Sequence, residues 1–356
     1  MCIEIDQLLK QRALPPLLQF ASGAAVTQEN FEARRLEMLQ LLQSEVYGTA
    51  PAAPAEVRVC ELERHEKRFA GKGCERELQL SFDTDNGVFS FPVREVRPNG
   101  VPGRCPMFIL LNFRPDVPDK YLPMEEILDA GCGVVRIYYN DVAFDGDDGF
   151  SGGIAAMYDR QRYTWGKLHM WAFAASRVMD YLLTTDYADP KRIAVAGHSR
   201  LGKTALLAAA LDTRFALTCV NDSGCSGAAL ARGKTGERVL DITKRFPYWF
   251  CEKYRDYAEK EGEMPFDQHF LIACVAPRRV AIGTAVEDLW ADTDAQYLAA
   301  CAASPAWELL GKKGFVHPDR LPEVGDCFSA GRVAFHLREG THYFSRADWH
   351  CYLSLL

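Results

Sequence analysis

The sequence predicts an α/β fold in which a mostly parallel sheet lies between two layers of helices. From residue 105 onward, short segments that are apolar throughout recur along the chain, as expected of strands buried on both faces. Segments of helical length separate these strands, and this alternation is typical of a three-layer sandwich with a parallel sheet. The 356 residues, 48% of them hydrophobic, are enough to form one large core.

The first hundred residues follow a different pattern. Residues 27–47 carry apolar side chains at helical spacing after Thr27, which we expect to cap a helix. After a linker rich in alanine and proline, residues 57–93 indicate two or three strands with turns at AGKG and DTDNG. We therefore predict a single domain with an N-terminal helical extension, residues 1–55, and a core, residues 56–356.

In the later part of this core, the expected strands and helices alternate, and no internal repeat interrupts them. The expected strands are residues 105–113, 132–139, 192–197, 215–221, 278–285 and 331–339. The expected helices are residues 124–131, 164–185 and 202–212, and a further one begins near His269.

Composition excludes several classes of partner. The net charge of -7, with charges interspersed, argues against nucleic acid or an anionic membrane as a partner. No run approaches 18 apolar residues, so no membrane-spanning helix is expected. The N-terminal residues lack the pattern of a secretory signal, which predicts a cytoplasmic protein; a secreted protein whose signal has been removed is the alternative. The twelve cysteines are scattered singly, which favours reduced thiols over a zinc site.

The stretch VAGHSRLGKTAL, residues 195–206, contains the candidate nucleophile. Ser199 stands directly after an expected strand and directly before an alanine-rich helix, which is the setting of the serine elbow in α/β-hydrolases. Gly197 and Gly202 supply small residues where strand and helix approach, although Gly202 comes one place later than in the usual G-x-S-x-G. The alternative is an ordinary turn with a capping serine. The combination favours an α/β-hydrolase fold.

Two cations follow the serine. The residue after an elbow nucleophile contributes its backbone N–H to the oxyanion hole, and here that residue is Arg200. Lys203 lies one helical turn beyond Ser199 on the same face, so its ammonium group can reach the rim of the pocket. Each charge alone is typical of a solvated surface, but the pair indicates an anionic substrate.

A catalytic base and an acid are expected after the serine in the chain. His342, in REGTHYFSRADW, is the strongest candidate base because it follows the last expected strand in a short loop, whereas His336 lies inside that strand and is expected to be packed. Asp222 and Asp288 each follow a strand, and either carboxylate can orient the imidazole. The loop that holds Asp288, after the penultimate strand, is the commoner place for a triad acid.

These residues resemble the glucuronoyl esterases, carbohydrate esterase family 15. The nucleophile motif of that family is G-[CH]-S-R-x-G-K, and GHSRLGK reproduces it with the late glycine included. SGCSGAAL, GERVLDITKRFPYWFCEKY, PFDQHFLIACVAPRR, EDLWADTDAQYL and GTHYFSRADW are similar to the bacterial branch. The resemblance runs from about Phe108 to Leu356.

The resemblance implies a serine esterase that needs no metal or other cofactor. Such an enzyme cleaves the ester between a 4-O-methyl-glucuronate side chain of xylan and an alcohol, so its partner is a small or oligosaccharide substrate. By position, the expected roles are Ser199 as nucleophile, His342 as base, Arg200 at the oxyanion, and Lys203, Glu237 and Trp290 as contacts of the glucuronate. Fungal members carry a glutamate at the position of Asp222, whereas some bacterial members use that of Asp288. An aspartate at 222 is one methylene shorter, so we favour Asp288.

Other functions compete with this interpretation. An acetyl xylan esterase or another carbohydrate deacetylating esterase shares the fold. An inactive carbohydrate-binding protein is a further alternative, disfavoured by the intact Ser199 and His342. A metal-dependent deacetylase is disfavoured because no clustered ligand set is present in the sequence. The segment FDGDDG, residues 144–149, suggests calcium but fails the EF-hand spacing, so we expect an exposed polar loop. Family members that degrade biomass are usually secreted, which differs from the cytoplasmic location predicted here.

Overall fold

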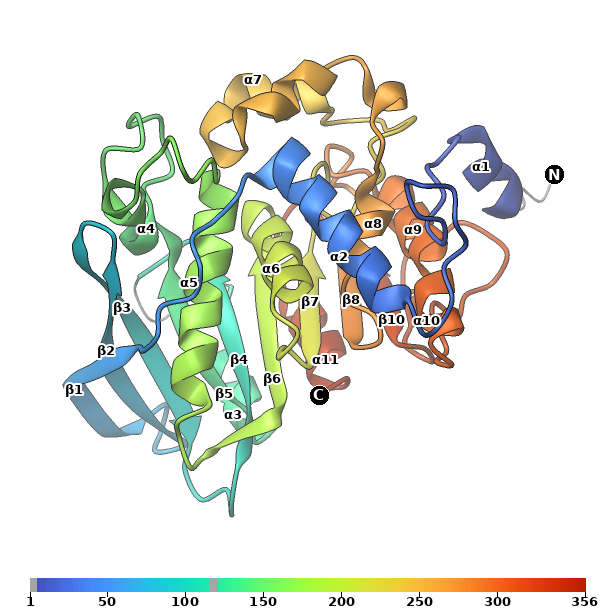
Figure 1. Cartoon of the computed structure of the whole chain (residues 1–356). Helices are drawn as coiled ribbons and strands as arrows, with labels where there is room; N and C mark the ends of the chain where they lie inside the picture. Colours follow the sequence, from blue (N-terminus) through green and yellow to red (C-terminus); the bar gives the residue numbers. More distant parts are fainter. Residues whose placement is uncertain (1–4, 116–120) are drawn as a thin grey trace.

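A ten-stranded sheet forms the centre of the part of the chain that the computed structural model describes, residues 5–115 and 121–356 (Figure 1). Its order is β1-β2-β3-β5-β4-β6-β7-β8-β10-β9. The strands are β1 Arg58–Arg68, β2 Gly73–Thr84, β3 Gly87–Pro98, β4 Cys105–Asn112, β5 Gly133–Tyr138, β6 Ala188–His198, β7 Leu217–Asn221, β8 Arg279–Ala285, β9 Cys327–Phe328 and β10 Val333–Arg338.

The sheet is mixed but mostly parallel. From β5 through β4, β6, β7 and β8 to β10, neighbouring strands pair in parallel. The first three strands form an antiparallel meander that joins this sheet through β5, and β9 pairs antiparallel with β10. The parallel strands β4 and β7 are buried along their whole length, as the sequence predicts for strands covered on both faces.

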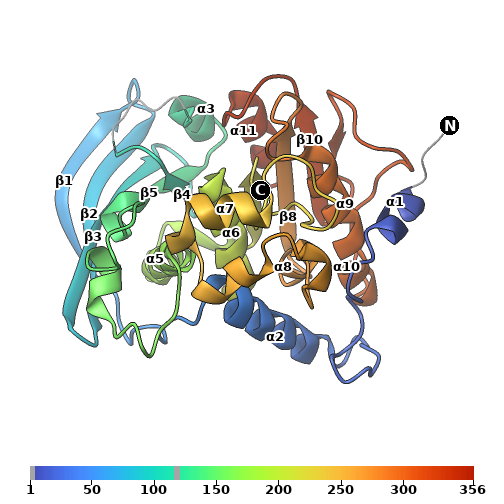
Figure 2. The same cartoon turned by 90° about the horizontal axis from the view of Figure 1, so that it is seen from above.

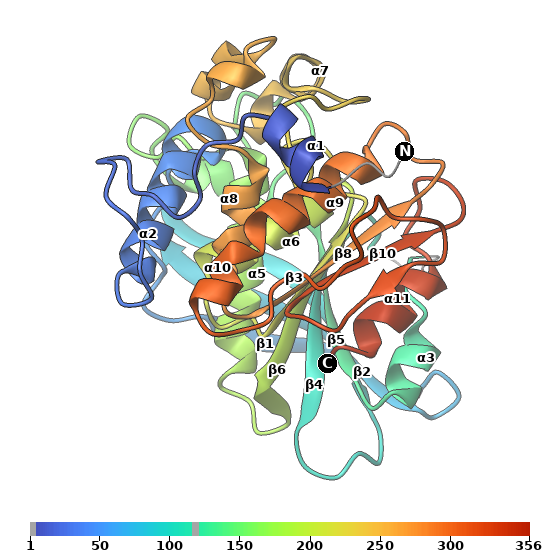
Figure 3. The ribbon, with the colours of Figure 1, turned by 90° about the vertical axis from the view of Figure 1, so that its right-hand side faces the viewer.

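Helices cover both faces of the sheet (Figure 2). One layer includes α2 Phe31–Leu42, α5 Lys167–Leu182, α6 Arg200–Leu211, α8 Gln268–Ala273, α9 Thr293–Ala303 and α10 Pro305–Leu309. The opposite layer is thinner and contains α3 Met124–Asp129 and α11 Arg346–Leu353 (Figure 3). On this face the buried Trp349 of α11 packs edge-on against Phe108 of β4, with ring centroids 5.3 Å apart. These layers and the sheet form an α/β-hydrolase fold.

Shorter helices complete the described chain. They are α1 Ile5–Gln11, the π-helical turn Gln43–Tyr47, α4 Tyr139–Val142, the 3₁₀ turn Gly153–Met157, α7 Val239–Arg245, and the 3₁₀ turns Pro247–Trp249, Glu252–Tyr257 and Glu261–Glu263. In Figure 1, α7 lies at the top, above the carboxyl ends of the parallel strands.

Most expected elements form, with differences at their ends. The helix predicted from Thr27 begins instead at Phe31, and Thr27 does not cap it: the Thr27 N–H donates to Oδ1 of Asn30, 2.7 Å away. Asn30 directly precedes the helix, and its side-chain oxygen binds the backbone of Thr27 instead of capping α2. The turns predicted within residues 57–93 are present, and they separate three strands. The helix expected near His269 is α8, which Asp267 caps.

The two edges of the sheet are different. Strand β1 is long and pairs with β2 on one side, and all its residues after Arg58 are exposed. Most of these exposed side chains are charged, and both signs occur. At the opposite edge, β9 contains two residues.

No helix among the described residues is long and apolar enough to cross a membrane. The cysteines of the same part of the chain are free thiols, most of them buried.

Candidate active site

Ser199 lies at a sharp turn between β6 and α6. Its backbone has φ 58° and ψ -126°, a conformation that L-residues adopt only when the surroundings impose it. The N–H of Ser199 donates to the carbonyl of Asn221 in the adjacent β7, 2.8 Å away, which fixes the turn against the sheet. The side chain of Ser199 does not cap α6, so its hydroxyl is left for the pocket.

Two glycines allow this turn. A methyl group at Gly197 would lie 2.1 Å from the carbonyl oxygen of Leu201, which is a severe clash with backbone. A methyl group at Gly202 would lie 2.9 Å from the carbonyl oxygen of Asn221. The late glycine is therefore placed where the first turn of α6 approaches the end of β7, and the buried Leu201 occupies the place of the usual second glycine.

A pocket of about 290 Å³ opens at this turn. All eight residues that the sequence predicts for the site line it: Ser199, Arg200, Lys203, Asp222, Glu237, Asp288, Trp290 and His342. They come from loops after β6, β7, β8 and β10 and from the start of α6, together with Glu237 just before α7. The carboxyl ends of neighbouring parallel strands thus bring together residues that are far apart in the chain.

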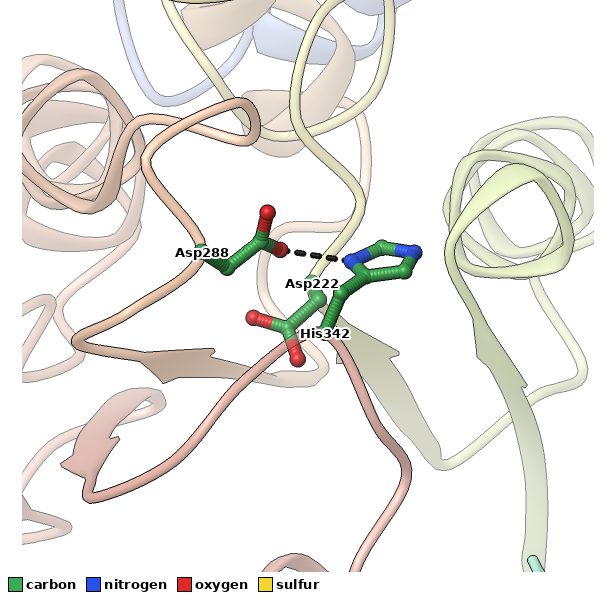
Figure 4. Close-up of side chains that lie close together, drawn as sticks. All are labelled: Asp222, Asp288 and His342. Carbon is green, nitrogen blue, oxygen red and sulfur yellow. Dashed lines mark hydrogen bonds and ion pairs between the residues drawn. The ribbon is translucent and has the colours of Figure 1, made fainter.

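His342 and Asp288 form a close pair (Figure 4). Nδ1 of His342 lies 2.6 Å from Oδ2 of Asp288. The imidazole is partly exposed, whereas the carboxylate is buried. Burial alone would raise the pKa of Asp288, but the hydrogen bond and the charge of His342 outweigh it and hold that pKa below its usual value. Asp288 is therefore an ionised acceptor for the ring.

Asp222 lies beside this pair but has different partners. Its Oδ1 accepts the N–H of Ala285, 3.0 Å away, and its Oδ2 lies 3.4 Å from a guanidinium nitrogen of Arg338. Burial, reinforced by the charges of Asp288 and Asp348, raises the pKa of Asp222 well above its usual value. Of the two candidate acids, Asp288 is the one that is hydrogen-bonded to the imidazole of His342 in the described structure.

His198 is a second imidazole at the site. Its centroid lies 4.4 Å from that of His342, and its Nδ1 lies 2.7 Å from Oδ1 of Asn221. Burial, with a contribution from the nearby His342, lowers the pKa of His198 to about 3. His198 is thus a neutral ring that packs behind the candidate base.

Arg200 extends from the first position of α6 into the pocket. Its Nη1 donates to Oδ2 of Asp145, and its guanidinium lies over the ring of Trp249, 4.7 Å from the centroid. Asp145 belongs to the segment FDGDDG, for which the sequence predicts an exposed polar loop. That expectation is wrong for Asp145, whose side chain is 5% exposed because Arg200 and Trp249 cover it.

Lys203 and Glu237 form a further part of the pocket wall. The ammonium group of Lys203 donates to the carbonyl of Ser223 and lies 3.6 Å from the carboxylate of Glu237. The N–H of Glu237 donates to the carbonyl of Trp290, which also accepts a hydrogen bond from the buried Lys234. The residue Trp290 is 51% exposed. This wall therefore presents a cation, an anion and an exposed aromatic ring, a set that suits a sugar acid.

Asp222, Asp288 and His342 also have ligand atoms that lie within 4.8 Å of one another, close enough to hold a metal ion. Their contacts point to another use, because Asp288 and His342 bind each other and Asp222 faces Arg338. The chemistry these residues can supply is proton transfer beside a serine.

Sequence reasoning missed several residues of this site. Phe246 and Trp249 line the pocket from the turn after α7, and Asp145 reaches Arg200 from the loop after α4. Phe246 and Trp249 lie in a segment that resembles the family, and His198 is adjacent to the serine; these were signals available in the sequence. No spacing rule connects Asp145 with Arg200.

The fold and the elbow define an α/β hydrolase, and comparisons with known proteins give its family. The family model described as "Glucuronyl esterase, fungi" matches residues 83–311. The chain is 34% identical to carbohydrate esterase MZ0003 of an unknown prokaryotic organism, over 96% of this chain and 88% of that protein. It is 30% identical to the 4-O-methyl-glucuronoyl methylesterase of Podospora anserina, over 82% of this chain and 59% of that longer protein.

Comparison with solved structures gives the same result as comparison with the sequences of known proteins. The glucuronoyl esterase of Solibacter usitatus superposes with a TM-score of 0.88 at 31% identity, over 96% of both chains. The chain therefore belongs to the glucuronoyl esterase family, carbohydrate esterase family 15, whose members are carboxylic ester hydrolases.

Proposed function

We propose that the protein is a 4-O-methyl-glucuronoyl methylesterase that cleaves esters of the glucuronate side chains of xylan. One observation carries the proposal: a single pocket contains the elbow serine, the hydrogen-bonded pair of His342 and Asp288, and a wall with Lys203 and Glu237. An ester of a uronic acid needs a nucleophile at its carbonyl and polar groups around its sugar ring. An acetyl ester requires only a small apolar site at its acyl group.

The reaction begins with attack of Ser199 Oγ on the ester carbonyl. Asp288 accepts a hydrogen bond from Nδ1 of His342, which leaves Nε2 as the base that takes the serine proton. The same imidazolium then returns this proton to the departing alcohol, and an acyl-enzyme forms. A water molecule, deprotonated by His342, hydrolyses the acyl-enzyme and releases the uronic acid.

The oxyanion of each tetrahedral intermediate lies at the start of α6 in this proposal. The backbone N–H of Arg200, the first residue of that helix, and the guanidinium of the same residue offer donors there. Lys203 and Glu237 contact the hydroxyl groups of the glucuronate, and Trp290 contacts one face of the sugar ring. His198 is neutral and does not compete with His342 for the serine proton.

The first prediction tests the nucleophile. Ser199→Ala should lower kcat for benzyl glucuronate by about 10³-fold or more, because the acyl-enzyme can no longer form. Hydrolysis is measured with benzyl glucuronate and with acetylated xylan, and folding by thermal melting. Ser354→Ala, at the end of the C-terminal helix, is the matched control and should retain the parent rate. A Ser199→Ala variant within tenfold of the parent contradicts the role, and a preference for acetylated xylan contradicts the substrate.

The cytoplasmic location that the sequence predicts stays a prediction. Fractionation of cells that express the full-length gene tests it, with activity on benzyl glucuronate as the readout.

A further inference from the structure

We propose that Asp145 is a positioning residue that holds the guanidinium of Arg200 toward the oxyanion, and that Lys167 in turn holds the loop of Asp145. This inference rests on the proposed function, because it assigns to Arg200 the stabilisation of a developing oxyanion. Asp145 and Lys167 are not among the candidate nucleophile, base and acids.

Arg200 has a long side chain that must be held in place to act in a transition state. Its guanidinium is bound to Asp145 at one nitrogen and rests on the ring of Trp249. The rings of Phe246 and Phe113 lie 5.3 and 5.6 Å from it. Its buried Nε has no hydrogen-bond partner among the described residues. The guanidinium is therefore anchored at Nη1, and Nη2, which makes no hydrogen bond within the described residues, remains as the donor for a substrate oxygen.

Asp145 uses both of its oxygens to build this anchor. Oδ2 accepts from Arg200 and from the hydroxyl of Tyr139, 3.0 Å away. Oδ1 accepts from the indole N–H of Trp249 at 2.7 Å. Asp145 thus fixes both the guanidinium and the aromatic ring on which it lies. The N–H of Asp145 donates to Oδ1 of Asn140 at 2.8 Å, so its own backbone is also held.

The loop that carries Asp145 is built around a buried ammonium group. Lys167, the first residue of α5, is fully buried. Its Nζ donates to the carbonyls of Phe144 and Gly146, both at 2.6 Å, and to Oδ1 of Asp148 at 2.7 Å. These are the three hydrogen bonds that an ammonium group can donate. The two carbonyls belong to the residues on either side of Asp145, so Lys167 sets the backbone from which Asp145 extends.

This arrangement explains the acidic segment FDGDDG. A buried cation is costly unless it is paired and its hydrogen bonds are complete, and here three oxygens meet that need. The oxygen-rich segment that suggested calcium in the sequence is bound to a lysine of the same chain. A series of contacts therefore leads from α5 to Lys167, to Asp145 and then to Arg200.

The test is a double-mutant cycle between Asp145 and Arg200. The rate constant kcat is measured with benzyl glucuronate and with p-nitrophenyl acetate. Asp145→Asn should lower kcat about tenfold to a hundredfold, with KM within about threefold, because Arg200 is less well aimed once its charged partner is lost. In an Arg200→Ala background, Asp145→Asn should cost less than about twofold, since the residue it positions is absent. Asp147→Asn, in the exposed part of the same loop, is the matched control and should resemble the parent.

Several outcomes would overturn the inference. These are an unchanged kcat in Asp145→Asn, a full additional loss in the Arg200→Ala background, or a loss confined to KM. Should Asp145→Asn not fold in thermal melts, Trp249→Phe removes the indole hydrogen bond to Oδ1 of Asp145 and keeps an aromatic ring, and the same cycle applies to it.

Measurements with two different esters distinguish a wrong role for Asp145 from a wrong substrate. An oxyanion forms from p-nitrophenyl acetate as well as from benzyl glucuronate, so the cycle can be measured on the acetate even if the uronate proves to be the wrong substrate. If Ser199→Ala retains activity on both esters, the proposed function fails, and the inference about Arg200 fails with it.

Discussion

At the scale of single residues, the two carboxylates beside His342 differ in what surrounds them. Asp288 is hydrogen-bonded to the imidazole, and its pKa is lowered. Asp222 faces Arg338 and a backbone N–H, and burial raises its pKa well above the usual value. The environments therefore favour Asp288 as the acid that orients His342.

We expect Asp288→Asn to lower kcat by about 10⁴-fold, because the amide favours the wrong tautomer of the imidazole. Asp222→Asn should cost much less, because the oxygens of Asp222 bind Ala285 and Arg338 and make no hydrogen bond to the ring in the described structure. Rates with benzyl glucuronate for the two single variants and the double variant separate these roles. A larger loss in Asp222→Asn would contradict the assignment, and two active single variants with an inactive double variant would mean that the acids replace one another.

Lys203 is expected to act on the sugar and not on the ester bond. Lys203→Ala should raise KM for benzyl glucuronate about tenfold to a hundredfold, as expected for the loss of a hydrogen bond to a charged group. Its effect on p-nitrophenyl acetate, which has no sugar, should be small. Michaelis parameters on both esters give the comparison, with the exposed Lys191→Ala as control. Equal losses on both esters would mean that Lys203 supports the fold or the chemistry itself.

At the scale of elements, the connection from β6 to α6 depends on close backbone approach. Gly202 belongs to the first turn of α6, where alanine is otherwise favoured over glycine by about 1 kcal/mol. The carbonyl oxygens of Asn221 and Gly197 lie 2.9 and 3.2 Å from the position of its missing Cβ. Backbone atoms cannot move away as a flexible side chain can. The late glycine of the motif is thus a requirement of packing between α6 and the sheet.

Gly202→Ala should therefore lower the free energy of unfolding by about 1–3 kcal/mol, the usual cost of overpacking. It should also lower kcat, because the start of α6 carries the proposed oxyanion donors. Urea denaturation and rates with p-nitrophenyl acetate measure the two effects. Gly262→Ala is the matched control, since no atom lies within 4 Å of its missing Cβ. A Gly202→Ala variant as stable as this control would contradict the argument.

The strands and helices of the parallel part of the sheet could be predicted from the sequence. The loops that complete the pocket could not. The strand β4 is buried throughout and the helix α6 is rich in alanine and leucine after its first turn, so a local pattern identifies both. Their order also predicted which residues meet at Ser199. The turn Pro247–Trp249 follows α7 without any periodic pattern, and its place over Arg200 depends on tertiary contacts. Asp145 was missed for the same reason, since its partner lies in a distant segment.

At the scale of the whole molecule, three buried histidines connect protonation with folding. Burial lowers the pKa of His169 and of His269 to about 4, and that of His198 to about 3. In the unfolded chain, histidine titrates near 6.5. Between these values the unfolded chain binds protons that the folded protein does not. The stability contributed by the three neutral rings is therefore complete above about pH 6.5 and is lost as the pH falls toward 4.

The melting temperature should accordingly fall steeply between about pH 6 and pH 4. If three protons are taken up on unfolding, the free energy of unfolding falls by up to about 4 kcal/mol for each pH unit. Thermal melts across this range measure it. His169→Gln and His269→Gln should each reduce this slope by about a third, because each removes one of the three protons taken up on unfolding. A flat profile in the parent would contradict the neutral state of these rings.

Strand β1 is the long edge strand of the sheet. Its outer backbone groups face away from β2, and such an edge can accept a strand from a second molecule. A strand that docked there would have to strip water from a row of charged side chains, among them Glu61, Glu63 and Arg64. Lysines and other charges on an edge strand make this addition unfavourable. At the opposite edge, β9 has only two residues, so it offers an added strand few backbone hydrogen bonds. The sheet therefore resists growth into fibres from both of its ends.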